Sequence, residues 1–203
     1  MFHVSRMTAR RALDQLALDG LIVRRRGSGS FMANNGVRSS FLVIRNIADE
    51  IAESGRKYTN QVLRHRIETA TQQVAIALRI RVGDQVYHSL LVHKGDSEAL
   101  QLEYRYVNKE VAPEYLSADL AAETPNHVLQ RLCPLTDAWQ DISATLPTRA
   151  QCDALTIRIG EPCLLITRTT ASHEALVSYA RILAPASRYQ LTGQLHFSSK
   201  ISD

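Results

Sequence analysis

Two pairs of strand-like runs constrain the fold of this chain more than any other feature. The runs VYHSLLVHK and LQLEYRYVN are separated by GDSEA, and EPCLLITRTT and ALVSYARILA flank SHEA. Aromatic and β-branched side chains of this kind pack well on a pleated face, and the short polar segments have the chemistry of turns. We predict that each pair forms an antiparallel hairpin.

Helical patterns surround the two hairpins. RNIADEIAESGR predicts a helix that ends at Gly55, TQQVAIALRI predicts a second, and TPNHVLQRL predicts a third, capped by Thr124 and begun by Pro125. The positions expected to face the core in the first two are Ile47, Ala48, Ile51, Val74, Ala75 and Leu78. WQDISATL is strand-like and TRAQCDALTI helical. Together these segments predict an α+β domain with a mainly antiparallel sheet.

A separate helix is predicted at the N-terminus. It begins at Ser5, which can act as its cap, and runs to about Asp19, where Gly20 suits a left-handed stop. The apolar positions that share one face are Ala9, Ala12, Leu13 and Leu16. An isolated helix of this length is marginal in water, so this stripe needs a partner to pack against.

The N-terminal helix is basic and is followed by a basic hairpin. Arg6 and Arg10 lie one helical turn apart, and LIVRR, RGSGS and FMA predict two short strands joined by a turn that needs Gly27 and Gly29. An arginine-bearing helix followed by such a wing is typical of a winged helix-turn-helix that meets DNA. A solvated basic helix with no DNA function is the alternative.

Charge supports the first interpretation. The formal charge is +4, and the first 26 residues contain six arginines against only Asp14 and Asp19, which accounts for the whole excess. A local basic face suits nucleic acid, because contacts to phosphates dominate the affinity of such complexes.

The rest of the composition points to a cytoplasmic globular protein. With 203 residues and 45% hydrophobic content the chain can bury a full-sized core, and it has neither a long apolar run nor a signal-peptide pattern. Cys133, Cys152 and Cys163 are odd in number and lie among apolar residues, which predicts buried free thiols. The seven histidines lack the spacing of a zinc helix, so we expect no metal and no cofactor.

The N-terminal segments VSRMTARRAL, LDGLI and RRRGSGSFMA resemble the second half of the DNA-binding domain of the GntR family of bacterial transcriptional regulators. The resemblance implies that Ser5 and Thr8 touch phosphates, that Arg6 and Arg10 read bases or phosphates, and that Gly29 brings the wing to the minor groove. Arg26 at the wing tip joins this DNA-binding set.

The same resemblance implies a missing part, since the family places a helix, a strand and a further helix before this point. We therefore expect the chain as written to be truncated and to bind operator DNA poorly, because the apolar stripe of its helix has no cover. The domain organisation that we predict is a partial winged helix-turn-helix at 1–33, a linker at 34–38 and a second domain at 39–203.

The second domain resembles the UTRA effector-binding domain of the HutC subgroup, the histidine-utilisation repressors. The segments that carry the resemblance are QLEYRYVN, APEYL, TPNHVL, PLT, EPCLLITRTT and ASRYQLTG. It implies a chorismate-lyase-like fold, a homodimer and release from operator DNA by a small carboxylate, urocanate.

A candidate effector site lies on the first hairpin. In LQLEYRYVN, the side chains of Gln101, Glu103 and Arg105 share one face of the strand. Glu103 can accept an N–H from an imidazole ring, whereas the acid end of urocanate needs a cation such as Arg105 or Arg168, or a donor such as His93.

The family pattern adds His93, Thr124 and Ser178 to this effector-binding set. For each residue a structural role is the alternative: Glu103 and Arg105 can pair across the sheet, His93 can be a hydrogen-bonded core residue, and Thr124 can be only a helix cap.

Departures from the subgroup leave the ligand open. Tyr104 stands where an acidic residue is common, and DAWQDISA replaces a stretch that often carries EH. A related branch senses amino-sugar phosphates and would want more cationic residues where this chain has Leu91 and His93. A sensor that does not grip DNA is a further alternative.

Catalysis is not indicated. The chain has no GxSxG elbow, phosphate loop or paired-carboxylate motif, and we expect Asp49, Glu50 and Glu53 to form a solvated helix face. We therefore predict a regulator and no catalytic residues.

Overall fold

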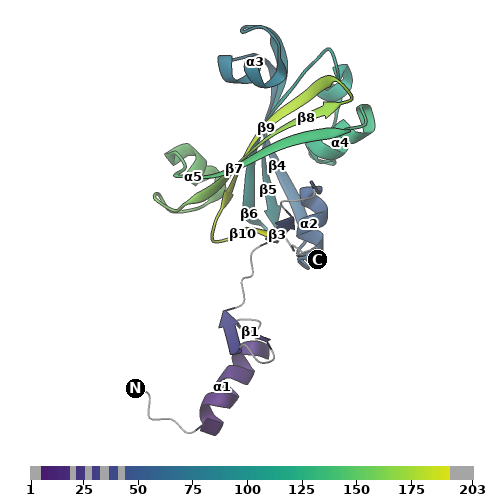
Figure 1. Ribbon diagram of the computed structural model, residues 1–203. Helices are drawn as coiled ribbons and strands as arrows, with labels where there is room; N and C mark the ends of the chain where they lie inside the picture. Colours follow the sequence, from purple (N-terminus) through teal and green to yellow (C-terminus); the bar gives the residue numbers. More distant parts are fainter. Residues whose placement is uncertain (1–5, 19–21, 26–28, 33–36, 41–43, 193–203) are drawn as a thin grey trace, which may run out of the picture. The chain divides into compact units, whose positions relative to one another are not determined.

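The computed structural model describes residues 6–18, 22–25, 29–32, 37–40 and 44–192 (Figure 1). The chain forms two compact units, residues 1–36 and residues 37–203. Each unit is described by itself below.

The first unit contains a helix and a hairpin. Helix α1 (Arg6–Leu18) is followed by strands β1 (Ile22–Arg25) and β2 (Gly29–Met32), which pair antiparallel. The predicted helix and wing are thus confirmed, while the expected cap at Ser5 and the glycines at 20 and 27 lie outside the described residues. Leu13 and Leu16 are 39% and 37% exposed, so the apolar stripe of α1 is largely uncovered.

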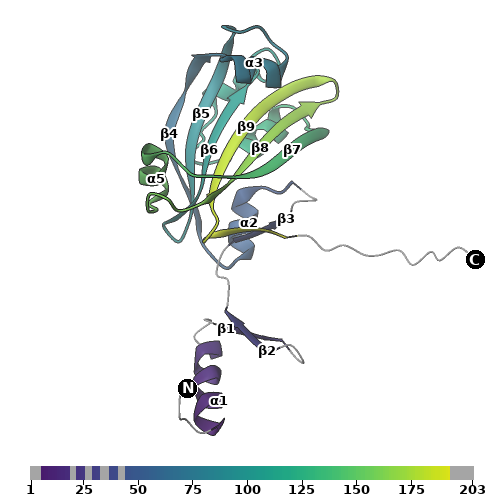
Figure 2. The same ribbon diagram turned by 60° about the vertical axis from the view of Figure 1, so that its left-hand side comes forward.

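The second unit is built on a six-stranded antiparallel sheet. Its strands are β4 (Tyr58–Thr69), β5 (Gln85–Gly95), β6 (Glu98–Val107), β7 (Asp137–Thr145), β8 (Cys163–Ser172) and β9 (Ala175–Pro185). Their order is β4-β5-β6-β9-β8-β7, so both predicted hairpins are confirmed and lie side by side at the centre (Figure 2). Asp96 and Ser97 have positive φ angles of 48° and 72°, as a two-residue hairpin turn requires.

Helices cover both faces of this sheet. On one face lie α2 (Ile47–Glu53), the 3-10 helix η1 (Pro113–Ser117) and α4 (Pro125–Leu132); on the other lie α3 (Gln72–Leu78) and α5 (Arg149–Leu155). The predicted cap at Thr124 forms, since its Oγ1 accepts a hydrogen bond from the amide of His127 at 3.2 Å. The six predicted core positions of α2 and α3 are buried, except that Ala48 is half-buried.

A small parallel sheet joins the two ends of the second unit. Strand β3 (Val37–Ser40) pairs with β10 (Tyr189–Thr192), so that Tyr189 lies opposite Val37. Val37 and Arg38, which we assigned to the linker from sequence, therefore lie in β3. Both Val37 and Tyr189 pack against Ile47 and Ile51 of α2 in one core cluster.

Three further properties complete the description of the fold. Cys133, Cys152 and Cys163 are buried free thiols, as predicted. No helix in the part of the chain that the structure describes is long and apolar enough to cross a membrane. Among the same residues, no group of three or more His, Cys, Asp or Glu side chains is arranged to hold a metal ion.

Candidate functional site

Strand register gathers polar side chains on one face of the sheet. Gln101, Glu103 and Arg105 point to the same side of β6, as their spacing predicted. Antiparallel pairing places Ala180 of β9 opposite Arg105, and Arg168 of β8 opposite Ala180. The two guanidinium groups therefore belong to one face although they are 63 positions apart in the chain.

This face forms the floor of a cavity of about 20 Å³. The other walls come from α2, from β10 and from the first residues of α4. The lining residues are Arg45, Ile47, Glu50, Gln101, Glu103, Arg105, Thr124, Pro125, Asn126, Ile166, Arg168, Ile182 and Tyr189. Most of them are buried. The side chain of Arg45 is 39% exposed, so the cavity opens to solvent beside Arg45.

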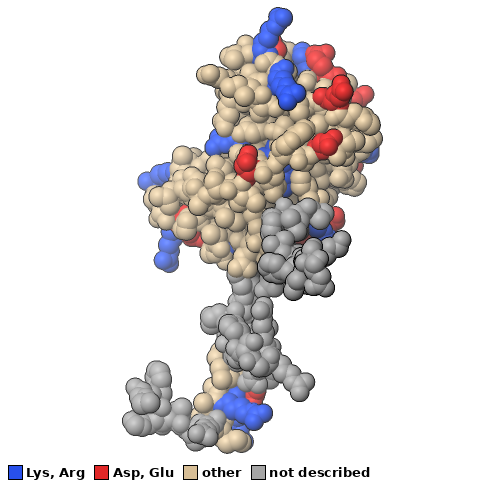
Figure 3. Space-filling model, in the orientation of Figure 1, with Lys and Arg blue, Asp and Glu red and all other residues tan. Residues whose placement is uncertain are grey.

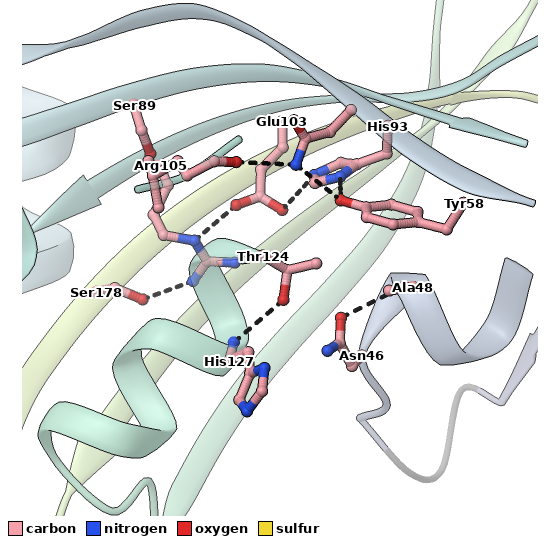
Figure 4. A network of polar contacts seen from close by, with 12 residues as sticks. Asn46, Ala48, Tyr58, Ser89, His93, Glu103, Arg105, Thr124, His127 and Ser178 are labelled. Carbon is pink, nitrogen blue, oxygen red and sulfur yellow. Dashed lines mark hydrogen bonds and ion pairs between the residues drawn. The ribbon is translucent and has the colours of Figure 1, made fainter. Parts of the chain in front are cut away.

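Glu103 and Arg105 form a buried ion pair at the centre of this floor (Figure 4). Arg105 Nε donates to Glu103 Oε1 at 2.6 Å, and Arg105 Nη1 donates to Ser178 Oγ at 2.9 Å. Burial alone would raise the pKa of Glu103, but the charge of Arg105 and the contact with His93 lower it, so the carboxylate is ionised. Ser178 is held in turn by Thr170 at 2.8 Å.

His93 supports Glu103 from behind. Its Nε2 lies 3.3 Å from Glu103 Oε2, and its Nδ1 lies 2.9 Å from the hydroxyl oxygen of Tyr58. Burial raises the pKa of Tyr58 to about 12, which keeps that hydroxyl protonated at neutral pH. The Asn60 amide donates to the same hydroxyl at 3.3 Å and to the Leu120 carbonyl at 2.8 Å. This chain of contacts fixes the position of Glu103.

Arg168 is the second guanidinium of the cavity, and its partner is uncharged. Its Nε and Nη2 donate to Gln140 Oε1 of β7 at 2.9 and 2.6 Å. Within the described part of the chain no carboxylate lies at ion-pair distance from Arg168. Burial and then repulsion by Arg105 lower its pKa, although a guanidinium stays charged at physiological pH.

The beginning of α4 adds one backbone hydrogen-bond donor, the amide of Asn126, to the residues that line the same cavity. Thr124 caps the helix through the amide of His127, and Pro125 has no amide hydrogen to offer. The backbone amide of Asn126 has no acceptor among the described residues. Because helix N-termini carry a partial positive charge, this end of α4 reinforces the attraction of the two arginines for an anion.

The structure gathers the six predicted effector-site residues around one cavity, but not in one layer. Glu103, Arg105, Thr124 and Arg168 line the cavity. His93 and Ser178, both 0% exposed, lie behind Glu103 and Arg105 and position them.

Sequence reasoning missed the opposite wall of the cavity. Glu50, expected to be solvated, is only 4% exposed and accepts a hydrogen bond of 2.9 Å from the Tyr189 hydroxyl. That expectation was wrong because Glu50 lies on the buried face of α2, one residue before Ile51. The spacing of Glu50 from Ile47 and Ile51 was the available signal.

The predicted DNA-binding residues belong to the first unit. Ser5 and Arg26 lie outside the described residues. Arg6 begins α1, and Thr8 and Arg10 in the same helix are exposed. Gly29 begins β2, opposite Arg25 of β1.

Comparison with known proteins identifies the family. The UTRA domain matches residues 53–190, and the description "Bacterial regulatory proteins, gntR family" matches residues 1–32. The histidine utilization repressor of Pseudomonas aeruginosa is 45% identical over 195 residues, which is 96% of this chain and 77% of that protein. The chain belongs to the GntR family of bacterial regulators with a UTRA domain.

Solved structures agree with this assignment. The C-terminal domain of the histidine utilization repressor from Pseudomonas syringae pv. tomato is 39% identical, has a TM-score of 0.67 and covers 70% of this chain and all of that one. PhnF from Mycobacterium smegmatis, at 22% identity and a TM-score of 0.76, shares the fold over 97% of this chain and 88% of that one. These relatives confirm that the GntR-family chain is a regulator of the histidine utilization repressor type and not an enzyme.

Proposed function

We propose that this GntR-family regulator represses histidine-utilisation genes and leaves its operator when urocanate occupies the cavity of the second unit. The observation that carries the proposal is Arg168, a half-buried guanidinium that lines the cavity and whose partner among the described residues is neutral. Such a charge is costly to bury, so an anionic ligand that pairs with it gains a large share of its affinity there.

The chemistry of the cavity complements both ends of urocanate. A carboxylate can accept hydrogen bonds from Arg168 and from the amide of Asn126, while Glu103 can accept an N–H from the imidazole ring. Hydrogen bonds to Glu103 and Ser178 fix the guanidinium of Arg105, so it is a rigid cation beside the carboxylate and the imidazole ring of the ligand.

The cavity must widen to take this ligand. A volume of about 20 Å³ has room for one water molecule, far less than a ring with an acid side chain. Arg45 is the exposed member of the lining set and is held by an ion pair with Glu53 on the surface. We expect Arg45 to move when the ligand enters, and α2 to shift with it.

In the proposed mechanism, the first unit binds the DNA. In this proposal Arg6, Thr8 and Arg10 of α1 contact DNA together with Ser5, and Arg26 and Gly29 carry the wing contacts. Two copies are needed to read an operator with two half-sites, so the repressor acts as a homodimer. Ligand and operator then weaken each other's binding reciprocally, as any pair of linked sites must.

Titration calorimetry of the chain with urocanate tests the ligand. We expect saturable binding that falls at least tenfold in Arg168→Gln. Arg181→Gln is the matched control, because Arg181 is also half-buried on the sheet but on the opposite face, opposite Thr167 and Tyr104. Absence of urocanate binding, or equal loss in both variants, would remove this cavity as the urocanate site.

A second test concerns the DNA contacts. In a fluorescence anisotropy titration with duplex DNA, Arg10→Ala should weaken binding and reduce the salt dependence by about one phosphate contact. The same variant should bind urocanate as the unchanged chain does. An unchanged salt dependence would exclude Arg10 from the phosphate contacts.

An amino-sugar phosphate is the second candidate ligand, and one observation favours it. Three guanidinium groups, those of Arg45, Arg105 and Arg168, line the same cavity, and a phosphate carries more charge than a carboxylate. A parallel titration with glucosamine 6-phosphate separates the two ligands, since the tighter one identifies the effector class.

A further inference from the structure

Two glutamates line the cavity of the second unit, one on each side. Glu103 lies on β6 in the floor, and Glu50 lies on α2 in the opposite wall. Both are only 4% exposed. The ion pair with Arg105 and the contact with His93 account for Glu103. A buried carboxylate is costly, so a second one in the wall of a cavity for an anion calls for a physical explanation.

The fold fixes the position of Glu50. It lies on the buried face of α2, between Ile47 and Ile51, which pack in one core cluster. The hydroxyl of Tyr189 in β10 donates a hydrogen bond of 2.9 Å to Glu50 Oε2, and Tyr189 is 3% exposed in the same cluster. The side chain of Glu50 therefore cannot turn out to solvent without breaking buried contacts.

Helix α2 covers one end of the cavity floor. Its residue Ile47 belongs to the same core cluster as Ile166 of β8 and Ile182 of β9. Ile182 lies opposite both Glu103 and Ile166, so these three residues form one row across the sheet. Because α2 packs on this row, Glu50 and Glu103 lie toward the same end of the cavity.

The other end of the floor is cationic. Arg105 lies opposite Ala180, and Ala180 lies opposite Arg168, so the two guanidinium groups belong to the neighbouring row. Asn126 at the start of α4 lines the cavity and also a groove with Thr170, the next residue after Arg168 on this face of β8. A ligand that places its acid group here has its other end near the two carboxylates.

The carboxylates also limit the charge that the cavity can take up. Burial and repulsion by Arg105 lower the pKa of Arg168, and the charges of Glu103 and Glu50 oppose this effect. Among the residues that line the cavity, three arginines stand against two glutamates, so one unit of positive charge is left for a ligand. One acid group neutralises that charge, whereas a second would be an unpaired charge in a buried site.

The outer surface contributes little to this selection. Figure 3 shows basic and acidic side chains scattered over the visible face of the second unit, with no broad patch of one sign. Salt screens exposed charges over about 10 Å at 0.1 M, whereas buried charges are screened much less. The charges inside the cavity are therefore the ones that distinguish one small anion from another.

We propose that Glu50 is a specificity-determining residue, which rejects ligands with a negative charge at both ends and favours those with an N–H donor opposite the acid group. Ionised carboxylates accept hydrogen bonds and repel one another, so Glu50 and Glu103 together select an N–H donor at their end of the cavity. This inference rests on the proposed function, because it concerns the ligand of the same cavity. It goes further by defining the ligand class and by excluding diacids.

Three ligands that share an acrylic acid group test this selection. Urocanate carries an imidazole ring on the far carbon of that group, cinnamate carries a phenyl ring without an N–H, and fumarate carries a second carboxylate. In titration calorimetry of the full chain, urocanate should bind at least about tenfold more tightly than either of the others. Fumarate is disfavoured by its second charge, and cinnamate is disfavoured because it offers no hydrogen to the carboxylates.

Glu50→Gln separates the charge of Glu50 from its shape. Glutamine can still accept the hydrogen bond from Tyr189, so we expect the variant to fold, which circular dichroism checks. The affinity for fumarate should rise at least about tenfold relative to the affinity for cinnamate, because only fumarate is relieved of a charge repulsion. Asp49→Asn is the matched control, since it removes the same charge from the exposed residue that precedes Glu50 in α2.

An unchanged ratio of fumarate to cinnamate affinity in Glu50→Gln, or an equal rise in Asp49→Asn, would overturn the proposal. Fumarate binding to the unchanged chain as tightly as urocanate would also overturn it, and that comparison needs no variant. Failure of the proposed function gives a different result, since urocanate then does not bind while the ratio of fumarate to cinnamate affinity still responds to Glu50→Gln. Binding of none of the three ligands by either chain would contradict both.

Discussion

His88 should make the second unit less stable in mild acid. Its side chain is 1% exposed and stacks on Tyr106 with 4.5 Å between the ring centroids. Its Nδ1 lies 3.2 Å from the carbonyl oxygen of Arg105, a contact that requires the proton on Nδ1. Burial lowers the pKa of His88 from 6.5 to about 4, and Glu68 offsets only part of this effect.

The size and sign of the effect follow from proton linkage. Above pH 6.5 both the folded and the unfolded chain hold His88 neutral, so its contribution to stability is fully present. As the pH falls below 6.5 the unfolded chain takes up a proton that the folded chain refuses until about pH 4. The free energy of unfolding therefore drops by about 2 kcal/mol at pH 5 and by about 3 kcal/mol once the loss levels off.

Urea unfolding followed by circular dichroism at pH 7.5 and pH 5 measures this loss. Other groups titrate in the same range, so the comparison is made with His88→Phe, which keeps an aromatic ring against Tyr106 but cannot take up a proton. We expect the unchanged chain to lose about 2 kcal/mol more than the variant between the two pH values. Equal losses would show that His88 is not held neutral by burial, and the reasoning would be wrong.

Three more predictions follow from single contacts. Thr124→Ala removes the cap of α4 and should lower the free energy of unfolding by about 1 kcal/mol in urea, whereas Thr124→Ser should not. Gly95→Ala should lower the free energy of unfolding by about 1–3 kcal/mol, because the new Cβ would lie 3.0 Å from Leu100 Cδ1. The melting temperature should fall accordingly, and an unchanged melting temperature would mean that the site relaxes. Gln140→Glu should reduce urocanate affinity about tenfold in calorimetry, since its carboxylate would neutralise Arg168, and unaltered affinity would contradict the assigned anion site.

Local patterns were sufficient to predict most of the second unit. The hairpins β5–β6 and β8–β9 follow from adjacent runs with short turns, and the cap at Thr124 stands next to the helix it begins. Strand β4 was not predicted, because its sequence YTNQVLRHRIET mixes polar and apolar residues on both faces and contains a bulge. The parallel pairing of β3 with β10 joins segments about 150 residues apart, which no local pattern can reveal.

As with the fold, the parts of the candidate site that are local in sequence could be predicted, and the parts that join distant segments could not. Gln101, Glu103 and Arg105 could be placed together because they alternate along one strand. The wall formed by Glu50 and Tyr189 could not, since their hydrogen bond spans 139 positions and Glu50 looks like an ordinary surface carboxylate in sequence. Long-range register, rather than residue type, decided which polar side chains face the cavity.

Two arginines of this cavity, the buried Arg105 and the half-buried Arg168, are held in different ways, and that difference is the strongest physical indication of function. Arg105 is neutralised by Glu103, as a structural ion pair requires. Arg168 is repelled by Arg105, and its partner among the described residues is the uncharged amide oxygen of Gln140. In the proposed function, this charge and the backbone amide of Asn126 bind the anionic end of the ligand, which enters and leaves the cavity. That requirement fits a sensor, whose cavity must be less stable without its ligand than with it.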